Sequence, residues 1–388
     1  MFSYVRIYLA NLIIPSNQIK CHLIVIFVAA KIMRILPKII FPVLLVILSG
    51  CVGTEHGLFP NGTEYAVCFD LVQNDSITGV VTIAPEAALS DTLWIDRPMD
   101  RIICMSSSHV AALSAIDAIQ TVKGVSGLRY ISDPTIDREA VTDVGYDAAL
   151  DYEAVLRLDP DLLVTYAVNG TEPAYVSKLR SLGVRTLVLH DHLEHHPLAR
   201  AEYVRLFGAL TGRQHVADSV FAEIRDSYLD LAASVCKEDP VKVLINIPYG
   251  DAWYIPGQEG YMSRLVEDAG GVILGAASGA SASSVISMEK AYGYSLEADI
   301  WLNPGSCKSR EELARVHHMF SRFGPIANGL PIYNNIRCVN EAGGNDFWER
   351  GAVRPDLILQ DLICIMKQAR GETKEDSPQE NLLFHIAL

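Results

Sequence analysis

Residues 198–235 are the feature that most restricts the fold of this 388-residue chain. They carry apolar residues at helical spacing and contain no proline. Gly208 and Gly212 weaken a helix, so the stretch predicts either one helix far longer than average or a pair of helices. The Asp239-Pro240 dipeptide ends it. On both sides, short apolar runs alternate with helical patterns, which predicts βαβ units and mostly parallel sheets.

The patterns begin with two β-rich runs, 65–70 and 79–83, which predict a β-hairpin around residues 73–76. Strands and helices then alternate. In the first half we expect a strand at 101–105, a helix at 108–119, a strand at 162–166, a helix at 171–182 and a strand at 186–189. In the second half we expect a strand at 243–247, a helix at 261–269, a strand at 299–302, a helix at 310–319, a strand at 332–333 and a final helix at about 355–366.

Two segments, 150–164 and 286–300, repeat one pattern. In each, an Asp or Ser that can cap a helix is followed two residues later by a glutamate, Glu153 or Glu289. A short helix, an acidic residue and an apolar strand follow. The repetition predicts two α/β lobes of like construction joined by the long helical stretch.

Cys51 ends the run Leu48-Ser49-Gly50-Cys51, which follows a basic and then an apolar region. That order describes a secretory signal peptide. A cysteine directly after the cut resembles the lipobox of bacterial lipoproteins, in which the thiol carries lipid. The alternative is a cysteine that ends a hydrophobic core segment. We expect translation to start at Met33, with residues 1–32 as upstream sequence.

The charge of the chain argues against nucleic acid as a partner. The first 50 residues hold five of the 32 Lys and Arg residues and no acid, so loss of the leader would change the formal charge from −14 to −19. An acidic protein of this kind is a poor nucleic-acid binder. The six cysteines beyond Cys51 form no C-x-x-C pair, and most lie in apolar patterns, so we expect buried thiols.

Taken together, these patterns resemble the class III family of substrate-binding proteins of ABC importers, which bind cobalamin and ferric siderophores. The resemblance covers about residues 98–368 and implies an α/β fold. It implies two Rossmann-like lobes with central, mostly parallel sheets, a long rigid helix that joins them and a ligand cleft between them. The segments that carry the resemblance are 101–106, Glu153 with 159–164, 182–184, the Glu289 segment, 343–349 and 353–357.

The resemblance implies a division of the chain and a function. The expected parts are an upstream extension with the signal peptide at 1–50, a lipid-anchored tether at 51–64, an N-terminal lobe with a leading β-hairpin at 65–196, a bridging helix at 197–238, a C-terminal lobe at 239–370 and a tail at 371–388. The protein is expected to be a periplasmic or extracytoplasmic monomer, tethered to a bacterial membrane by lipid. It would capture an iron or cobalt chelate (ferric siderophore, haem or cobalamin) and deliver it to a permease served by an ATPase. No intrinsic cofactor is expected.

In that family, one glutamate on each lobe pairs with arginines of the permease, which the resemblance implies for Glu153 and Glu289. The alternative is that each glutamate only occupies the first turn of a helix, where the helix dipole favours a negative charge. Both can hold at once.

Ligands of parallel α/β proteins lie beyond the carboxyl ends of the strands. That rule, together with the aromatic residues nearby, selects the residues expected to contact the ligand. About half of these aromatic residues could instead fill the core. Arg129 is the candidate for binding a carboxylate group of the ligand. The expected ligand-binding residues are Ser107, His109, Arg129, Tyr130, Tyr166, Asn169, Tyr249, Trp253, Tyr254, Asn303, Asn335 and Trp348.

A dense histidine cluster follows the last strand of the first lobe, with His190, His192 and His195 as weak metal candidates. Imidazole suits iron, copper and zinc, but histidines in a solvated loop are the alternative. Catalytic motifs such as G-x-S-x-G, H-E-x-x-H and the Walker loop are missing from the sequence, so we do not expect an enzyme. The alternative function is an exported metal-binding or chelatase-like lipoprotein enzyme that uses the His190–His196 cluster, because chelatases share the two-lobed architecture.

Overall fold

The computed structural model describes residues 62–74, 77–84, 89–167, 172–372 and 382–388. The predicted signal peptide, the lipidation site Cys51 and nearly all of the tether lie outside the described residues, as does Asn169. Within the described ranges, no helix combines the length and the apolar character needed to cross a membrane.

The N-terminal lobe is built on a five-stranded, fully parallel sheet with the order β6-β5-β4-β7-β8. The sequence predicted its three most buried strands because strands covered on both faces form continuous apolar runs. It missed β5 and the two-residue β6. The strands are β4 (Ile102–Cys104), β5 (Val122–Val125), β6 (Thr142–Asp143), β7 (Leu162–Tyr166) and β8 (Thr186–Leu189). The helices between them are α3 (Ser107–Ala115), α4 (Tyr152–Leu158) and α5 (Ala174–Ser181).

The C-terminal lobe has a second five-stranded sheet with the order β11-β9-β13-β14-β15, parallel except for the antiparallel edge strand β15. Its strands are β9 (Val241–Ile245), β11 (Gly271–Ile273), β13 (Ile300–Leu302), β14 (Ile332–Asn334) and β15 (Ile386–Ala387). A hairpin-like pair, β10 (Trp253–Ile255) and β12 (Ser284–Ile286), lies beside it. The helices are α9 (Tyr261–Asp268), α10 (Met288–Glu297), α11 (Arg310–Val316) and α12 (Gly324–Ala327).

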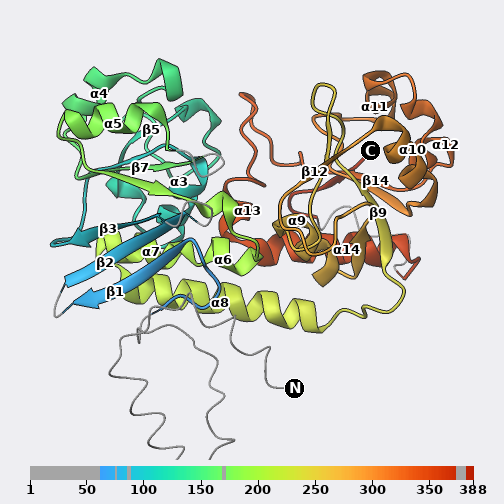
Figure 1. Ribbon diagram of the computed structural model, residues 1–388, viewed down its shortest axis with the longest axis horizontal. Coiled ribbons are helices and arrows are strands. Elements are labelled where there is room, and N and C mark those ends of the chain that lie inside the picture. The colour runs from blue at the N-terminus through green and yellow to red at the C-terminus, as the bar shows by residue number, and fades with distance from the viewer. Residues whose placement is uncertain (1–61, 75–76, 85–88, 168–171, 373–381) are drawn as a thin grey trace, which may run out of the picture. The chain divides into compact units, whose positions relative to one another are not determined.

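The two lobes share one topology, which confirms the predicted α/β fold (Figure 1). The central run β4-β7-β8 of the first sheet corresponds to β9-β13-β14 of the second. Helix α4 precedes β7 and α10 precedes β13, as the repeated sequence pattern predicts. The side chain of Asp151 accepts a hydrogen bond from the backbone N–H of Ala154 at 2.9 Å, and Ser287 does the same for Lys290 at 3.3 Å. These N-caps fix where the two helices begin.

The N-terminal segment forms three strands, not the predicted hairpin. Strands β1 (Phe69–Asn74), β2 (Ile77–Ala84) and β3 (Leu89–Ile95) make an antiparallel sheet in that order. The pairing of β1 with β2 agrees with the prediction. The third strand was missed because 89–95 mixes apolar with polar residues and lacks a continuous apolar run.

The predicted bridge, expected as one long helix or a pair of helices, consists of three helices: α6 (Pro197–Ala201), α7 (Tyr203–Thr211) and α8 (Gln214–Ala233). Gly212 ends α7 in the left-handed conformation, with φ of 69°, where a side chain is strained. Gly208 allows the turn to close, because a Cβ atom there would lie 2.4 Å from the Cβ of Ala217 in α8. The 20-residue helix α8 runs beneath both lobes and packs against α14 (Pro355–Ala369) (Figure 1).

Buried carboxylates hold the chain segments outside the parallel sheets. Glu202, fully buried, accepts hydrogen bonds from the backbone N–H groups of residues 64–66 at 2.7–2.9 Å. Asp361 in α14 accepts those of residues 383–385 at 2.8–3.1 Å. Residues 382–388, predicted to be part of a tail, therefore belong to the C-terminal lobe, where β15 extends the sheet.

Replacement of Gly208 by alanine tests the close contact between α7 and α8. The added methyl group overlaps Ala217, so we expect Gly208→Ala to lower the free energy of unfolding by about 1–3 kcal/mol. Gly293→Ala is the matched control, because Gly293 lies in helix α10 with no atom within 4 Å of the new Cβ. It should stabilise the protein by up to about 1 kcal/mol. Chemical denaturation measures both, and equal effects would refute the close contact.

Candidate functional site

The carboxyl ends of β4, β5 and β7 open into a cavity of about 660 Å³, called here the wall cavity. Four tyrosines and three serines dominate its lining, as expected where parallel strands end together. The lining residues are Met105, Ser106, Ser107, Ser126, Tyr130, Ile131, Tyr146, Asp147, Tyr166, Glu172, Pro173 and Tyr175.

Two tyrosines of the wall cavity, Tyr130 and Tyr175, have polar partners. The hydroxyl groups of Tyr175 and Thr165 lie 2.6 Å apart, and burial raises the pKa of Tyr175, so its phenol stays protonated. The guanidinium group of Arg129 lies over the ring of Tyr130, 4.6 Å from its centroid, and donates to its hydroxyl. The phenols therefore present hydroxyl groups and ring faces to a bound molecule.

A smaller cavity of about 170 Å³, the floor cavity, lies next to the wall cavity and shares Ser106 and Tyr166 with it. It collects residues from α3, α6, α7, the 3₁₀ turn after β8 and α13 (Arg350–Val353). The lining residues are Ser106, Ser108, His109, Ala112, Tyr166, Asp191, His192, Arg200, Tyr203, Phe207, Trp348, Ala352 and Val353.

The ring nitrogens of two histidines that line the floor cavity are buried. His109 is 2% exposed and interacts with the backbone of Val164, whereas both ring nitrogens of His192 have no hydrogen-bond partner among the described residues. The nearest charge to His109 is Asp191, with 4.0 Å between Nε2 and Oδ2. Burial lowers the pKa of both rings, so both are neutral at neutral pH.

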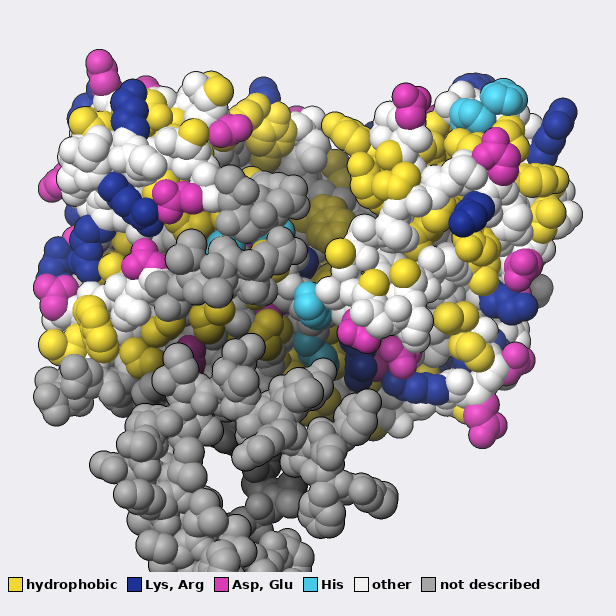
Figure 2. All heavy atoms as spheres, viewed as in Figure 1, with side chains coloured by type: hydrophobic (Ala, Val, Ile, Leu, Met, Phe, Trp, Pro, Cys, Tyr) yellow, Lys and Arg dark blue, Asp and Glu magenta, His cyan; other side chains and the backbone are white. Residues whose placement is uncertain are grey.

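A hollow separates the two lobes on the side away from α8, and hydrophobic side chains line both of its walls (Figure 2). Five of the predicted cleft residues line the two cavities. Ser107, Tyr130 and Tyr166 line the wall cavity, and His109, Tyr166 and Trp348 line the floor cavity. Arg129 is exposed beside Tyr130 and does not line either cavity.

Of the residues predicted from the C-terminal lobe, Trp348 lines the floor cavity, and the other five line neither cavity. Trp253 is corrected: it is 1% exposed, donates to the carbonyl of Ile245 and stacks with Trp301, so it belongs to the core. Asn303 and Asn335 are buried. Tyr249 and Tyr254 are exposed, at 85% and 45%, and the structure does not bring them to the described cavities.

The histidines of the predicted cluster do not come together at one site. His192 lines the floor cavity, whereas His195 is exposed and lines a separate cavity beside α9. His190 is buried with an unpartnered Nδ1. Among the residues that the structure describes, no group of three or more His, Cys, Asp or Glu side chains could hold a metal ion. All six described cysteines are free thiols, but only Cys68, Cys104 and Cys307 are buried as expected; Cys338 and Cys364 are half-buried and Cys236 is exposed.

Several residues that line the wall and floor cavities were not predicted from the sequence. Ser126 follows β5, and the strand-end rule would have selected it had that strand been predicted. Tyr175 lies in the first turn of α5, and Tyr146 lies in a loop. Both line the wall cavity, but neither follows a strand, so the strand-end rule does not select them. Arg200 and Tyr203 line the floor cavity, but they were not predicted because they lie in the segment assigned to the bridging helix.

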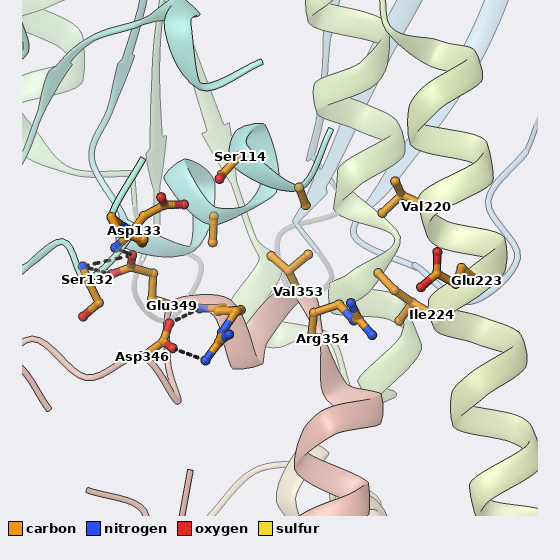
Figure 3. Close-up of a pocket in the computed structure, with 14 residues that line it drawn as sticks. Ser114, Ser132, Asp133, Val220, Glu223, Ile224, Asp346, Glu349, Val353 and Arg354 are labelled. Atoms are coloured by element: carbon orange, nitrogen blue, oxygen red, sulfur yellow. Dashed lines mark hydrogen bonds and ion pairs between the residues drawn. The ribbon is translucent and has the colours of Figure 1, made fainter. Parts of the chain in front are cut away.

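A third cavity of about 530 Å³, the side cavity, lies between α3, α8 and the segment 346–354 (Figure 3). Glu349 connects the lobes there. Its carboxylate accepts hydrogen bonds from the backbone N–H groups of Ser132 and Asp133 at 2.7–3.0 Å. Burial, with the nearby Asp346 and Asp133, raises its pKa to about 7 despite these bonds.

The chain belongs to the periplasmic binding protein family, whose model matches residues 102–323, more than half of its length. This is a family of solute-binding proteins, not of enzymes. The sequence resemblance to substrate-binding proteins is thereby confirmed.

Relatives and solved structures agree with this family. An uncharacterized lipoprotein of Methanocaldococcus jannaschii is 24% identical over 70% of this chain and 66% of its own length. A cobalamin-binding protein of Halobacterium salinarum is 27% identical over 48% and 49%. The chain thus spans two thirds or less of these relatives. The vitamin B12 binding protein BtuF of Vibrio cholerae (17% identity, TM-score 0.53) and the heme-binding protein RhuT of Roseiflexus (18%, 0.54) each cover 70% of this chain, with 98% of their own length, and share its fold.

The contact of Glu349 predicts a pH dependence of stability. Its pKa is higher in the folded than in the unfolded state, so the folded protein holds this proton more tightly. Its contribution is therefore full below about pH 4.5 and is lost as the pH rises to about 7, on the order of 3 kcal/mol. Glu349→Gln removes this proton, so the difference between wild-type and variant unfolding free energies should change across that window. Glu341→Gln, an exposed residue of the same segment, serves as control. A flat difference curve for Glu349→Gln would refute the shift.

Proposed function

We propose that this protein is the extracytoplasmic solute-binding component of an ABC importer. It captures a metal chelate between its lobes and delivers it to the permease through Glu153 and Glu289. A lipid on Cys51 holds it at the membrane, which keeps it near the permease at a high effective concentration. The ATPase that drives transport is on another chain.

The equivalent placement of Glu153 and Glu289 carries the proposal. Each is exposed in the first turn of a side-chain-capped helix, α4 or α10, that precedes the corresponding strand of its lobe. Both helices lie on the side of the molecule away from α8 (Figure 1). The cap of Ser287 and the helix N-terminus lower the pKa of Glu289, which keeps it charged. Two carboxylates on one side, one for each lobe, suit a partner that presents two arginines.

The cavities support a large aromatic-contacting ligand. Together the wall and floor cavities approach the size of typical ligand sites, about 300–1,000 Å³. Tyrosine ring faces suit a flat macrocycle or a compact chelate. The names of the similar proteins, which bind cobalamin, vitamin B12 or heme, support the same class. The lipoprotein name of the Methanocaldococcus relative supports the lipid anchor.

The chelatase-like alternative has less support. It needs the segment His190–His196 to assemble a metal centre, and the described histidines point to different cavities. Membership of a family of binding proteins also favours capture over turnover.

Charge reversal tests the docking role. We expect the double variant Glu153→Arg and Glu289→Arg to abolish chelate uptake by cells, because arginines of the permease would then face like charges. Ligand affinity of the purified variant should be unchanged, since both residues lie outside the cavities.

The matched control reverses Glu139 and Glu297, two exposed glutamates, one in each lobe, outside the first turns of α4 and α10. Normal uptake by this control alongside loss in the Glu153 and Glu289 variant is the expected result. Normal uptake by both would contradict docking through these residues.

Removal of Tyr166 tests the cleft. This side chain lines both cavities, so Tyr166→Ala should weaken binding of any chelate that the wild-type protein binds by about tenfold or more. Trp94→Ala removes a comparably exposed aromatic ring from β3, away from the cavities, and should leave affinity unchanged. Fluorescence titration with cyanocobalamin, hemin and ferrioxamine measures this. Equal affinities for both variants would place the ligand elsewhere.

A further inference from the structure

Two of the side chains that line the wall cavity, Tyr130 and Ile131, lie on one loop of the N-terminal lobe, residues 127–133, called here the Tyr130 loop. Its regular part is a single 3₁₀ turn, in which the backbone N–H of Tyr130 donates to the carbonyl of Gly127 at 2.8 Å. One turn of this kind has weak hydrogen-bond geometry and does not fix a loop by itself. The positions of the two side chains therefore depend on what holds the loop from outside.

The N-terminal lobe holds mainly the beginning of the Tyr130 loop. The carboxylate of Asp143 accepts hydrogen bonds from the backbone N–H groups of Gly127 and Leu128 at 3.0 and 2.9 Å. The guanidinium group of Arg138 donates to the carbonyls of Leu128 and Ile131 at 3.0 and 2.6 Å. The rest of the loop faces a different part of the chain.

That part is residues 335–349 of the C-terminal lobe, called here the crossing segment, which follows β14. Near its start, the backbone N–H of Arg337 donates to the carbonyl of Phe384 at 3.1 Å. Near its end, the ring of Phe347, 1% exposed, packs edge-on against the ring of Phe384, with 5.8 Å between the centroids. Phe384 is fully buried in the C-terminal lobe. Both ends of the crossing segment are thus fixed to that lobe.

The middle of the crossing segment contacts the Tyr130 loop. Nδ2 of Asn340 donates to the carbonyl oxygens of Arg129 and Ile131, at 3.2 and 3.4 Å. Gly344 passes so close that a Cβ atom there would lie 1.9 Å from the carbonyl oxygen of Tyr130. A residue without a side chain is therefore needed at position 344.

Glu349 continues this contact, because its carboxylate accepts hydrogen bonds from the next two backbone N–H groups of the loop, those of Ser132 and Asp133 (Figure 3). Each residue from 129 to 133 thus has one backbone group against the crossing segment. Since only backbone groups are used, the side chains of Tyr130 and Ile131 remain available to the wall cavity.

We propose that Asn340 and Gly344 are positioning residues for the wall cavity, because through the Tyr130 loop they set where the side chains of Tyr130 and Ile131 lie. The wall cavity belongs to the N-terminal lobe, yet its shape then depends on the C-terminal lobe, to which the crossing segment is fixed. A rotation of the lobes moves the crossing segment and the loop together, so affinity for the ligand changes with the position of the lobes. This inference rests on the proposed function and adds a coupling between its site and the movement of the lobes.

Asn340→Asp tests the contact with little other change. The carboxylate keeps the oxygen that accepts hydrogen bonds from the backbone N–H groups of Ala342 and Gly344 at 3.0 and 2.8 Å. It replaces the Nδ2 donor by an oxygen that repels the two carbonyl oxygens of the loop. The purified variant is titrated with cyanocobalamin, hemin and ferrioxamine. For each probe that the wild-type protein binds, affinity should fall about fivefold.

A double-mutant cycle separates positioning from a purely structural role. Tyr130→Ala removes the ring that the crossing segment positions, so adding Asn340→Asp to this variant should lower affinity by less than about twofold. A segment that only stabilises the fold would weaken binding by the same factor in both backgrounds. Gly344→Ala, whose methyl group displaces the loop, should behave as Asn340→Asp does. Asn328→Asp, the same change at an exposed residue outside the cavities, should bind as the wild type does.

Hydrogen exchange of the protein without ligand gives a second readout. Measured by mass spectrometry, the backbone amides of residues 129–133 should exchange about fivefold faster in Asn340→Asp and in Gly344→Ala, because the loop opens more often. Amides of the central strands β4 and β9 should keep their wild-type rates. Asn328→Asp is again the control.

The outcomes separate this inference from the function on which it rests. Equal loss of affinity in both backgrounds overturns the positioning role and leaves chelate capture standing, as does unchanged affinity in both Asn340→Asp and Gly344→Ala. Binding of no probe by the wild-type protein overturns the proposed function, and the exchange rates then decide the inference alone. Unchanged rates at 129–133 overturn it, and faster rates there with unchanged strand rates support it.

Discussion

Buried carboxylates that accept successive backbone N–H groups hold this structure together where its sheets do not. Glu202 fixes residues 64–66, Asp361 fixes 383–385 and Glu349 joins the lobes through Ser132 and Asp133. A buried charge is costly unless hydrogen bonds replace its hydration. For Glu349 two N–H donors do so only in part, because burial still raises its pKa to about 7. Each of these acids can therefore stay inside the protein only while the segment that it binds is in place.

The contact of Glu349 and the helix α8 set how the lobes can move. A 20-residue helix under both lobes resists bending, and α14 packs along it. A hydrogen-bonded bridge on the side cavity adds a second connection. Opening of the hollow would be a small rotation about these two elements, not a swing on loops, so the walls that meet a ligand are largely preformed.

The strand-end rule selected cavity residues in the first lobe but not in the second, where only Trp348, which follows no strand, lines a cavity. Strand ends in the first lobe are bordered by small residues and tyrosines, so Tyr166 and His109 remain accessible to the cavities. The same rule selected Trp253 in the second lobe, where Trp301 and the phenylalanines of 320–323 enclose it. Whether an aromatic ring faces a cleft or the core depends on residues that are distant in the sequence. A local sequence pattern does not identify those residues.

Local pattern alone determined the alternation of strands and helices, the duplication that places Glu153 and Glu289, and the α/β class, because these follow from apolar spacing and capping residues within a few positions. Only the tertiary structure decided that Gly208 packs against Ala217 of α8, that Glu349 crosses between lobes and that Trp253 lies in the core. Each of those outcomes depends on a contact between segments that are far apart in the chain. Such contacts form only when the chain has folded and buried both partners, so a local sequence pattern does not reveal them.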